Sequence, residues 1–121
     1  MRRLKEKSAP ECPAETTLCY IGGSWKVMIV WHLLGGQRKR HAEMRRILRG
    51  VTPKILVQQL REMQHHGLIK RRIFPEIPPR VEYSLTALGE SLAPLVKAMY
   101  RWGQGAQKRQ RREIRDGLKQ L

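Results

Sequence analysis

Acidic residues are scarce in this chain of 121 residues, where 25 Lys and Arg face 10 Asp and Glu. The resulting net charge of +15 attracts polyanions, and nucleic acid is the commonest polyanion that a protein of this kind binds. Ribosomal proteins and membrane-surface proteins can be equally basic. The charge therefore favours a nucleic-acid partner without identifying one.

Long apolar runs are also missing. The longest, Val27–Trp31 with its continuation past His32 to Leu33-Leu34, is far too short to span a bilayer. The opening segment MRRLKEKSAPECP is basic but has no apolar stretch behind it, which argues against a secretory signal. We therefore expect a cytoplasmic protein that does not act at a membrane.

Cysteine is rare, with only Cys12 and Cys19 present. Two cysteines do not make a disulfide scaffold, and thiols in the cytoplasm are reduced by default. Together with His65 and His66 they give none of the usual zinc-ligand spacings, so we expect no metal. No catalytic triad, carboxylate pair or phosphate-binding glycine loop stands out, so we expect neither an enzyme nor a bound cofactor.

The chain is long enough for one core, and neither a repeat nor a linker divides it, so we predict a single domain over residues 1–121. Both of its ends are basic. We expect segment 1–11 to be frayed, and segment 106–121 to be either a solvated helix or disordered.

Two helices are predicted in the first third of the chain. Pro13 suits the first position of a helix that begins at Cys12, runs to about Ile21 and buries Cys19. After the glycine pair 22–23, Ser24 is expected to cap a second helix over about 25–34.

A helix-turn-helix pattern follows. The first helix is expected over His41–Leu48, Gly50 supplies the turn, and Thr52 caps a second helix that starts at Pro53 and closes at 66–67. The residues expected to face inward are Ala42, Met44 and Ile47 or Leu48 in the first helix, and Ile55, Leu56, Leu60 and Met63 in the second.

Beyond the second helix the period changes to that of strands. Leu68–Phe74 and Arg80–Leu85 are rich in β-branched, aromatic and basic residues, and a proline-bearing tip joins them. Helix, turn, helix and basic hairpin form the layout of a winged helix-turn-helix, a mainly α fold with a small β-hairpin wing that places one helix in the DNA major groove.

One further helix is predicted after the wing, capped by Thr86 and kinked where Pro94 interrupts it. Its apolar residues recur at helical spacing and form a stripe: Leu88, Leu92, Leu95, Val96, Met99 and Trp102. This stripe fits core packing, and it is longer than one small core requires.

The candidate DNA-binding residues fall into two groups. The outward face of the second motif helix carries Lys54, Val57, Gln58 and Arg61, and the wing carries Lys70, Arg71, Arg72 and Arg80. Gln58 can bond an adenine edge, Lys54 and Arg61 can reach guanine or phosphate, and Val57 can touch a thymine methyl. The wing cations suit phosphates or the minor groove, and Arg40 and Thr52 complete the set. A solvated helix face and a charge-protected hairpin would carry similar residues.

Several motifs together resemble one family. They are Cys12-Pro13, Ile21-Gly22-Gly23-Ser24-Trp25-Lys26, Gly67-Leu68-Ile69 with Arg71, and Pro79–Thr86 with Gly89. These motifs, from about Cys12 to Trp102, are similar to those of the HxlR-type transcriptional regulators, a branch of the MarR-like winged helix proteins. The chain departs from the family where His41 replaces a usual aromatic and where Thr52-Pro53 replaces a usual serine-containing helix start.

The resemblance implies a homodimer that joins through its terminal helices and binds a palindromic operator in double-stranded DNA. Such a dimer controls nearby genes, and we expect this control to be repression. Several relatives sense electrophiles or oxidants through the cysteine that matches Cys12. In this sequence Cys12 lies at a helix start, where backbone N–H groups favour a thiolate, although an inert small residue would fit there too. The resemblance therefore implies a redox role for Cys12.

Two other functions stay open on the sequence. One is sequence-independent binding of nucleic acid by an architectural or RNA-associated protein, driven by the net charge. The other is a regulator that answers to a small molecule bound at the dimer interface, with no role for cysteine.

Overall fold

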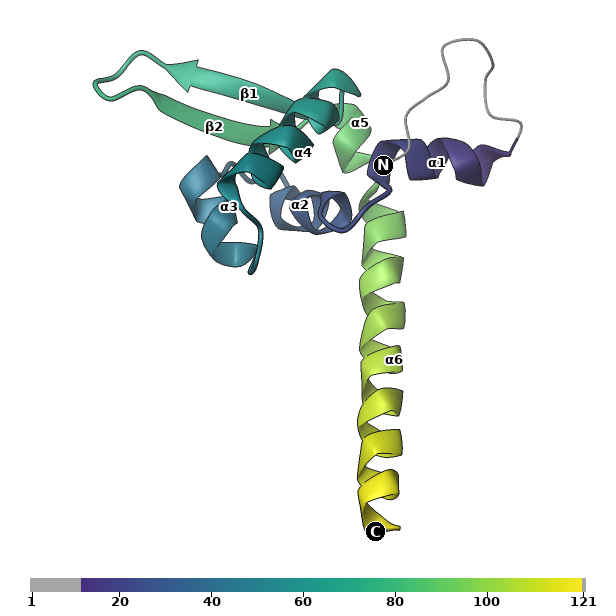
Figure 1. Cartoon of the computed structure of the whole chain (residues 1–121). Helices are drawn as coiled ribbons and strands as arrows, with labels where there is room; N and C mark the ends of the chain where they lie inside the picture. Colours follow the sequence, from purple (N-terminus) through teal and green to yellow (C-terminus); the bar gives the residue numbers. More distant parts are fainter. Residues whose placement is uncertain (1–11, 121) are drawn as a thin grey trace.

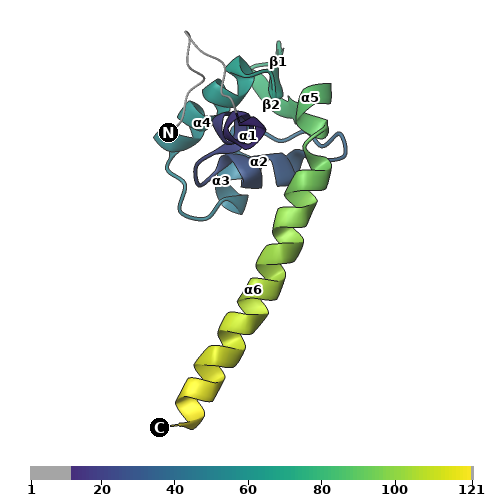
Figure 2. The same ribbon diagram turned by 90° about the vertical axis from the view of Figure 1, so that its right-hand side faces the viewer.

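The computed structural model describes residues 12–120, and Figure 1 shows their arrangement. In chain order the elements are α1 (Pro13–Ile21), α2 (Lys26–Leu33), α3 (His41–Ile47), α4 (Pro53–His65), β1 (Ile69–Phe74), β2 (Arg80–Leu85), α5 (Ala87–Glu90) and α6 (Ala93–Lys119). The helices α1 to α5 and the hairpin gather together, while α6 projects away from them as one long rod (Figures 1 and 2). The predicted winged helix fold is confirmed.

The core lies where α2, α3, α4, the base of the hairpin and the start of α6 meet. Its buried apolar residues are Ile21, Ile29, Val30, Leu33, Met44, Leu48, Leu56, Leu60, Met63, Leu68, Ile69, Leu85 and Val96. Cys19 is buried as predicted. The stacked rings of Trp31 and Tyr100, with centroids 3.8 Å apart, fasten the first turns of α6 to α2.

Two predictions about inward faces and one about a helix cap were wrong. Ala42 is exposed in α3, where Met44 and Leu48 are the buried pair. Ile55 is exposed in α4, because the buried stripe at helical spacing runs through residues 56, 59, 60 and 63 and places Gln59 inside. Ser24 does not cap α2, whose N-cap is Trp25 without a side-chain cap bond.

The turn and the wing follow the prediction. Gly50 adopts a φ of +88°, a left-handed conformation that glycine enters without a steric penalty. The Thr52 hydroxyl accepts a hydrogen bond from the Ile55 N–H at 3.1 Å and so caps α4. β1 and β2 pair antiparallel. Lys39 exchanges two backbone hydrogen bonds with Tyr83, which forms an isolated β-bridge along the other side of β2.

The end of the chain differs from the single kinked helix that we predicted. Thr86 caps a short α5 that stops at Glu90, and Pro94 lies in the first turn of a separate helix, α6. That position suits proline, because the missing N–H has no partner inside the helix there. The segment 106–119 is helical, whereas the expectation for 1–11 lies outside the described residues. Among residues 12–120, no helix is long and apolar enough to cross a membrane.

Candidate nucleic-acid interface

The outer face of α4 presents the four predicted reading residues side by side. Spacings of three and four residues bring them to one face of the helix. Together with Pro53 and Glu62 they line a groove of about 650 Å³, and its predicted members are Lys54, Val57, Gln58 and Arg61. All four are exposed, so their polar ends are available to a ligand in the groove.

A second, smaller basin lies beside the wing. It has a volume of about 290 Å³ and is lined by Arg38, Lys70, Arg71, Arg72, Glu82 and Ser84. Three of these cations were predicted, whereas Arg38 was not. It belongs to the basic loop before α3, and the Lys39–Tyr83 pairing carries this loop to the edge of the hairpin. Four cations against one carboxylate make the basin suitable for an anion such as a backbone phosphate.

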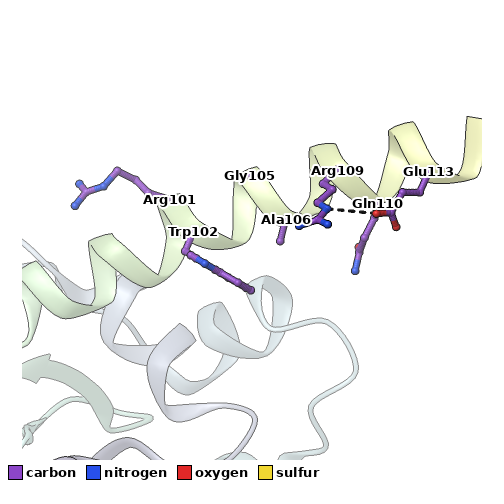
Figure 3. A pocket seen from close by; sticks show the side chains of 7 residues that line it. All are labelled: Arg101, Trp102, Gly105, Ala106, Arg109, Gln110 and Glu113. Atoms are coloured by element: carbon purple, nitrogen blue, oxygen red, sulfur yellow. Dashed lines mark hydrogen bonds and ion pairs between the residues drawn. The ribbon is translucent and has the colours of Figure 1, made fainter.

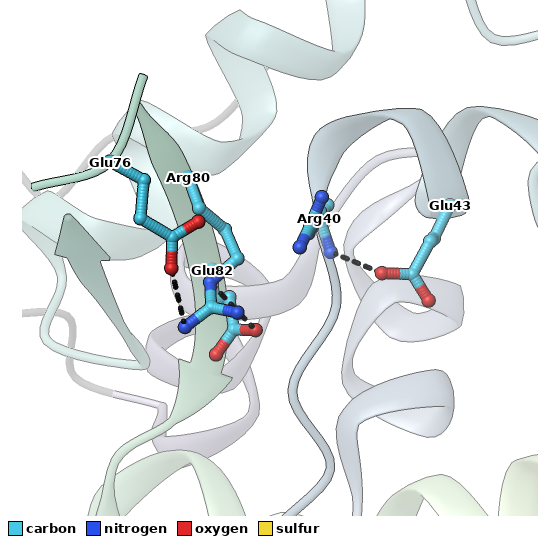
Figure 4. A network of polar contacts seen from close by, with 5 residues as sticks. All are labelled: Arg40, Glu43, Glu76, Arg80 and Glu82. Atoms are coloured by element: carbon cyan, nitrogen blue, oxygen red, sulfur yellow. Dashed lines mark hydrogen bonds and ion pairs between the residues drawn. The ribbon is translucent and has the colours of Figure 1, made fainter. Parts of the chain in front are cut away.

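Arg80 is held within the wing itself. Its guanidinium lies 4.0 Å from the centroid of the Phe74 ring, and the Arg72 guanidinium lies 4.7 Å from the same centroid. The Arg80 side chain also pairs with Glu76 at 3.3 Å and with Glu82 at 3.9 Å (Figure 4). These contacts join the two strands near the tip, so Arg80 stiffens the wing.

Arg40 and Thr52 lie at the starts of the two motif helices. The backbone N–H of Arg40 donates to Glu43 at 3.0 Å, which leaves its exposed guanidinium outside that bond (Figure 4). The Thr52 hydroxyl caps α4, and the residue remains exposed.

The two cysteines share helix α1 but have different surroundings. Cys12 is exposed at the N-cap and Cys19 is buried. Seven residues of helix separate their Cα atoms by about 10 Å, since each residue rises about 1.5 Å. A disulfide requires Cα atoms less than about 7 Å apart, so the two cannot join while α1 is intact.

The apolar stripe of α6 is largely uncovered. Val96 is buried, but Leu95, Met99 and Trp102 are exposed, and so are two apolar residues on another face near the end of the helix, Ile114 and Leu118. A groove of about 560 Å³ runs along this part of α6, where Trp102 and Ala106 point to the same side of the helix (Figure 3). Trp102 is 78% exposed, whereas tryptophan side chains in folded proteins are highly buried on average.

The fold, with the exposed face of α4 and the basic wing, defines a winged helix-turn-helix regulator, which is a DNA-binding protein and not an enzyme. The family described as HxlR-like helix-turn-helix matches residues 20–111, and the chain belongs to this family.

Similar proteins include regulatory proteins from bacteria and a redox regulator. The regulatory protein MalR of Fusobacterium mortiferum is 43% identical over 101 residues, covering 84% of this chain and 95% of MalR. The HTH-type transcriptional regulator YdeP of Bacillus subtilis is 44% identical over 93 residues, covering 77% and 72%. The redox regulator HypR in its oxidised form superposes with a TM-score of 0.74 at 44% identity, covering 78% of this chain and 96% of HypR.

Proposed function

We propose that this protein is a homodimeric repressor that binds a palindromic operator. The observation that carries the proposal is the row of exposed side chains on α4, set between the basic basin of the wing and the turn at Gly50. In this family a helix so presented enters the major groove, and wing cations hold the flanking backbone.

The proposed division of labour assigns base reading to α4 and backbone contact to the wing. Gln58 has the amide needed for a bidentate bond with adenine, and Arg61 has the fork that fits guanine. Arg38, Lys70 and Arg71 contact phosphates from the basin. Arg80 contributes by keeping the wing in shape, because its guanidinium already has partners there.

To test for an operator, duplexes that bind the protein are selected from a random library, and the tightest-binding sequence is footprinted. The proposal expects a protected inverted repeat whose half-sites are one helical turn, about 34 Å, apart. Equal affinity for every duplex, with a steep dependence on salt, would support sequence-independent binding in its place.

The dimer is proposed to form over the exposed stripe of α6. Trp102 and its apolar neighbours need cover from water, and a second copy of the helix supplies an apolar surface of the same length. Sedimentation of the purified protein at several concentrations measures this directly, and a monomer at micromolar concentration contradicts it.

Redox control through Cys12 is the most specific part of the proposal. It is supported by the exposure of Cys12 at the start of α1 and by the similarity to the redox regulator HypR. Since Cys19 is out of reach within α1, oxidation by diamide must join Cys12 to a thiol from another molecule, such as the partner's Cys12 or a small thiol. The two thiols lose two protons and two electrons, and diamide takes up both.

The test compares operator release by diamide in the wild-type protein, Cys12→Ser and Cys19→Ala. Release should be lost in Cys12→Ser and retained in Cys19→Ala, with a mixed disulfide visible by mass spectrometry in the proteins that respond. Release that is unchanged in Cys12→Ser would remove the sensor role and favour a small-molecule signal.

A further inference from the structure

Lys26 is a cation buried completely in the interior. Its exposed fraction is 0%, a rare state for lysine, which is almost never fully buried without a charged partner. Its Nζ lies 3.0 Å from an Oε of Glu62, and the carboxylate side chain is 19% exposed. The Lys26 ammonium has given up its water, so a nearby carboxylate offsets part of the cost of burying its charge.

The pair joins two elements with different tasks. Lys26 opens α2 inside the core, whereas Glu62 belongs to α4 and also lines the groove that Gln58 and Arg61 share. Glu62 follows Arg61 directly and lies one helical turn after Gln58. The ion pair thus fastens α4 immediately behind the two residues proposed to read bases.

A ring contact holds the same end of α4. The rings of Tyr20, from α1, and His66, the C-cap of α4, lie 5.3 Å apart at an angle of 53°. Upstream, α4 meets the core through apolar residues such as Leu56 and Leu60. The apolar contacts already limit rotation of α4, and the 3.0 Å ion pair adds a restraint, because the attraction is strong only while Glu62 faces Lys26.

We propose that Lys26 is a positioning residue for base reading: by holding Glu62, it fixes the rotation of α4 and hence the placement of Gln58 and Arg61 in the major groove. A rotation of about 20° would move an atom about 6 Å from the helix axis by roughly 2 Å. Hydrogen bonds of about 2.7–3.2 Å do not survive such a displacement. The proposal rests on the proposed DNA-binding function of α4.

The decisive variant removes both ions together. Lys26→Met with Glu62→Leu replaces the pair by apolar side chains, a change that often leaves stability equal or higher. Glu62→Gln is the conservative variant, because its amide oxygen can accept a hydrogen bond from the Lys26 ammonium. The matched control is Arg115→Gln with Asp116→Asn, which removes one exposed cation and one exposed anion of α6 outside the groove beside Trp102.

The first measurement is amide hydrogen exchange over residues 53–66, at conditions where the variants are equally stable. The proposal expects exchange in this segment to be at least fivefold faster in the double variant than in the wild-type protein and the control. Unchanged exchange in a stable double variant would overturn the positioning role without any DNA being present.

The second measurement is the ratio of affinities for the selected operator and a scrambled duplex. We expect this ratio to fall at least tenfold in the double variant and to survive in Glu62→Gln and in the control. A double variant that keeps the wild-type ratio would overturn the proposal. If the wild-type protein itself shows no preference, the operator proposal fails, while the exchange rates still decide whether the pair holds α4.

Discussion

Gln58 and Arg71 stand for the two kinds of contact that the interface offers. Gln58→Ala should weaken operator binding by about 1–3 kcal/mol and relax the preference at one base pair, because an amide reads a base edge. Arg71→Ala should weaken binding to all duplexes and lower the salt slope by about one unit, because it removes one phosphate contact. Titrations at several salt concentrations separate them, and the reverse pattern would mean that the groove assignment is wrong.

Gly89 is the residue where the fold leaves least room. A Cβ built there would lie 2.2 Å from the backbone oxygen of Leu68 at the base of the wing. Gly89→Ala should therefore destabilise the protein by about 1–3 kcal/mol in urea unfolding, as overpacking usually does. Gly103→Ala, where nothing lies within 4 Å, is the control and should be neutral or stabilising. Equal stability of the two variants would contradict this packing.

The individual residues also show how far sequence reasoning reaches. The exposed positions of Lys54, Val57, Gln58 and Arg61 could be predicted because a polar face needs only the helical period. Lys26 was missed, although its spacing from Ile29, Val30 and Leu33 is that of a buried stripe. Its charge concealed the pattern, since burial depends on Glu62, which lies 36 residues further along the chain.

Among the elements, the wing depends on Phe74. The guanidinium groups of Arg72 and Arg80 both lie over its ring, and each such contact is worth about 0.5–1 kcal/mol at an exposed site. Phe74→Ala should cost roughly this much stability and weaken binding to all duplexes with little change in salt slope, because no charge is removed. Ile73→Ala, at the neighbouring exposed position, tests whether any apolar loss does the same. Equal losses in both variants would argue against the role of the ring.

The junction of α1, α2 and α4 makes stability depend on pH. Burial first, then Lys26 and His65, lower the pKa of His66 below 6.5, while Glu62 acts in the opposite direction. A lowered pKa means that the folded state favours neutral His66, so this stability is present above pH 6.5 and is lost as pH falls through the lowered pKa.

Urea unfolding between pH 8 and pH 5 checks this prediction. The free energy of unfolding should fall below about pH 6.5, and the fall should be shallower in His66→Gln. Some dependence should remain, because burial and Lys39 also lower the pKa of His32. A His66→Gln profile that matches the wild-type protein would exclude His66 as its source.

The elements could be predicted unequally. Thr52 and Pro53 located α4 to the residue, because capping and proline chemistry are local. The break between α5 and α6 could not be predicted from Pro94 alone, since proline fits either a kink or a first turn. Where the chain breaks between α5 and α6, Gly89 lies close to Leu68, and a contact between such distant segments is not visible in the local sequence.

For the whole molecule, self-association is the property most exposed to test. Trp102 can bury about 150 Å² or more, worth about 4 kcal/mol at 25 cal/mol per Å². Trp102→Asp should therefore raise the dimer dissociation constant at least tenfold in sedimentation, without unfolding a side chain that is already exposed. Gln107→Asp, elsewhere on the surface of α6, is the charge-matched control. Equal association of the two variants would place the dimer interface elsewhere.

Helix α6 has a mechanical consequence. Its 27 residues extend over about 40 Å, and the Trp31–Tyr100 stack fastens only its first turns to the reading unit. It is therefore a lever with a short base: beyond Tyr100 it extends about 29 Å, so a tilt of about 5° at that stack displaces the far end by roughly 2.5 Å. In a dimer joined through two such helices, a small tilt of each α6 would change the distance between the two α4 helices. The dimer can bind an operator only when this distance matches the spacing of the half-sites.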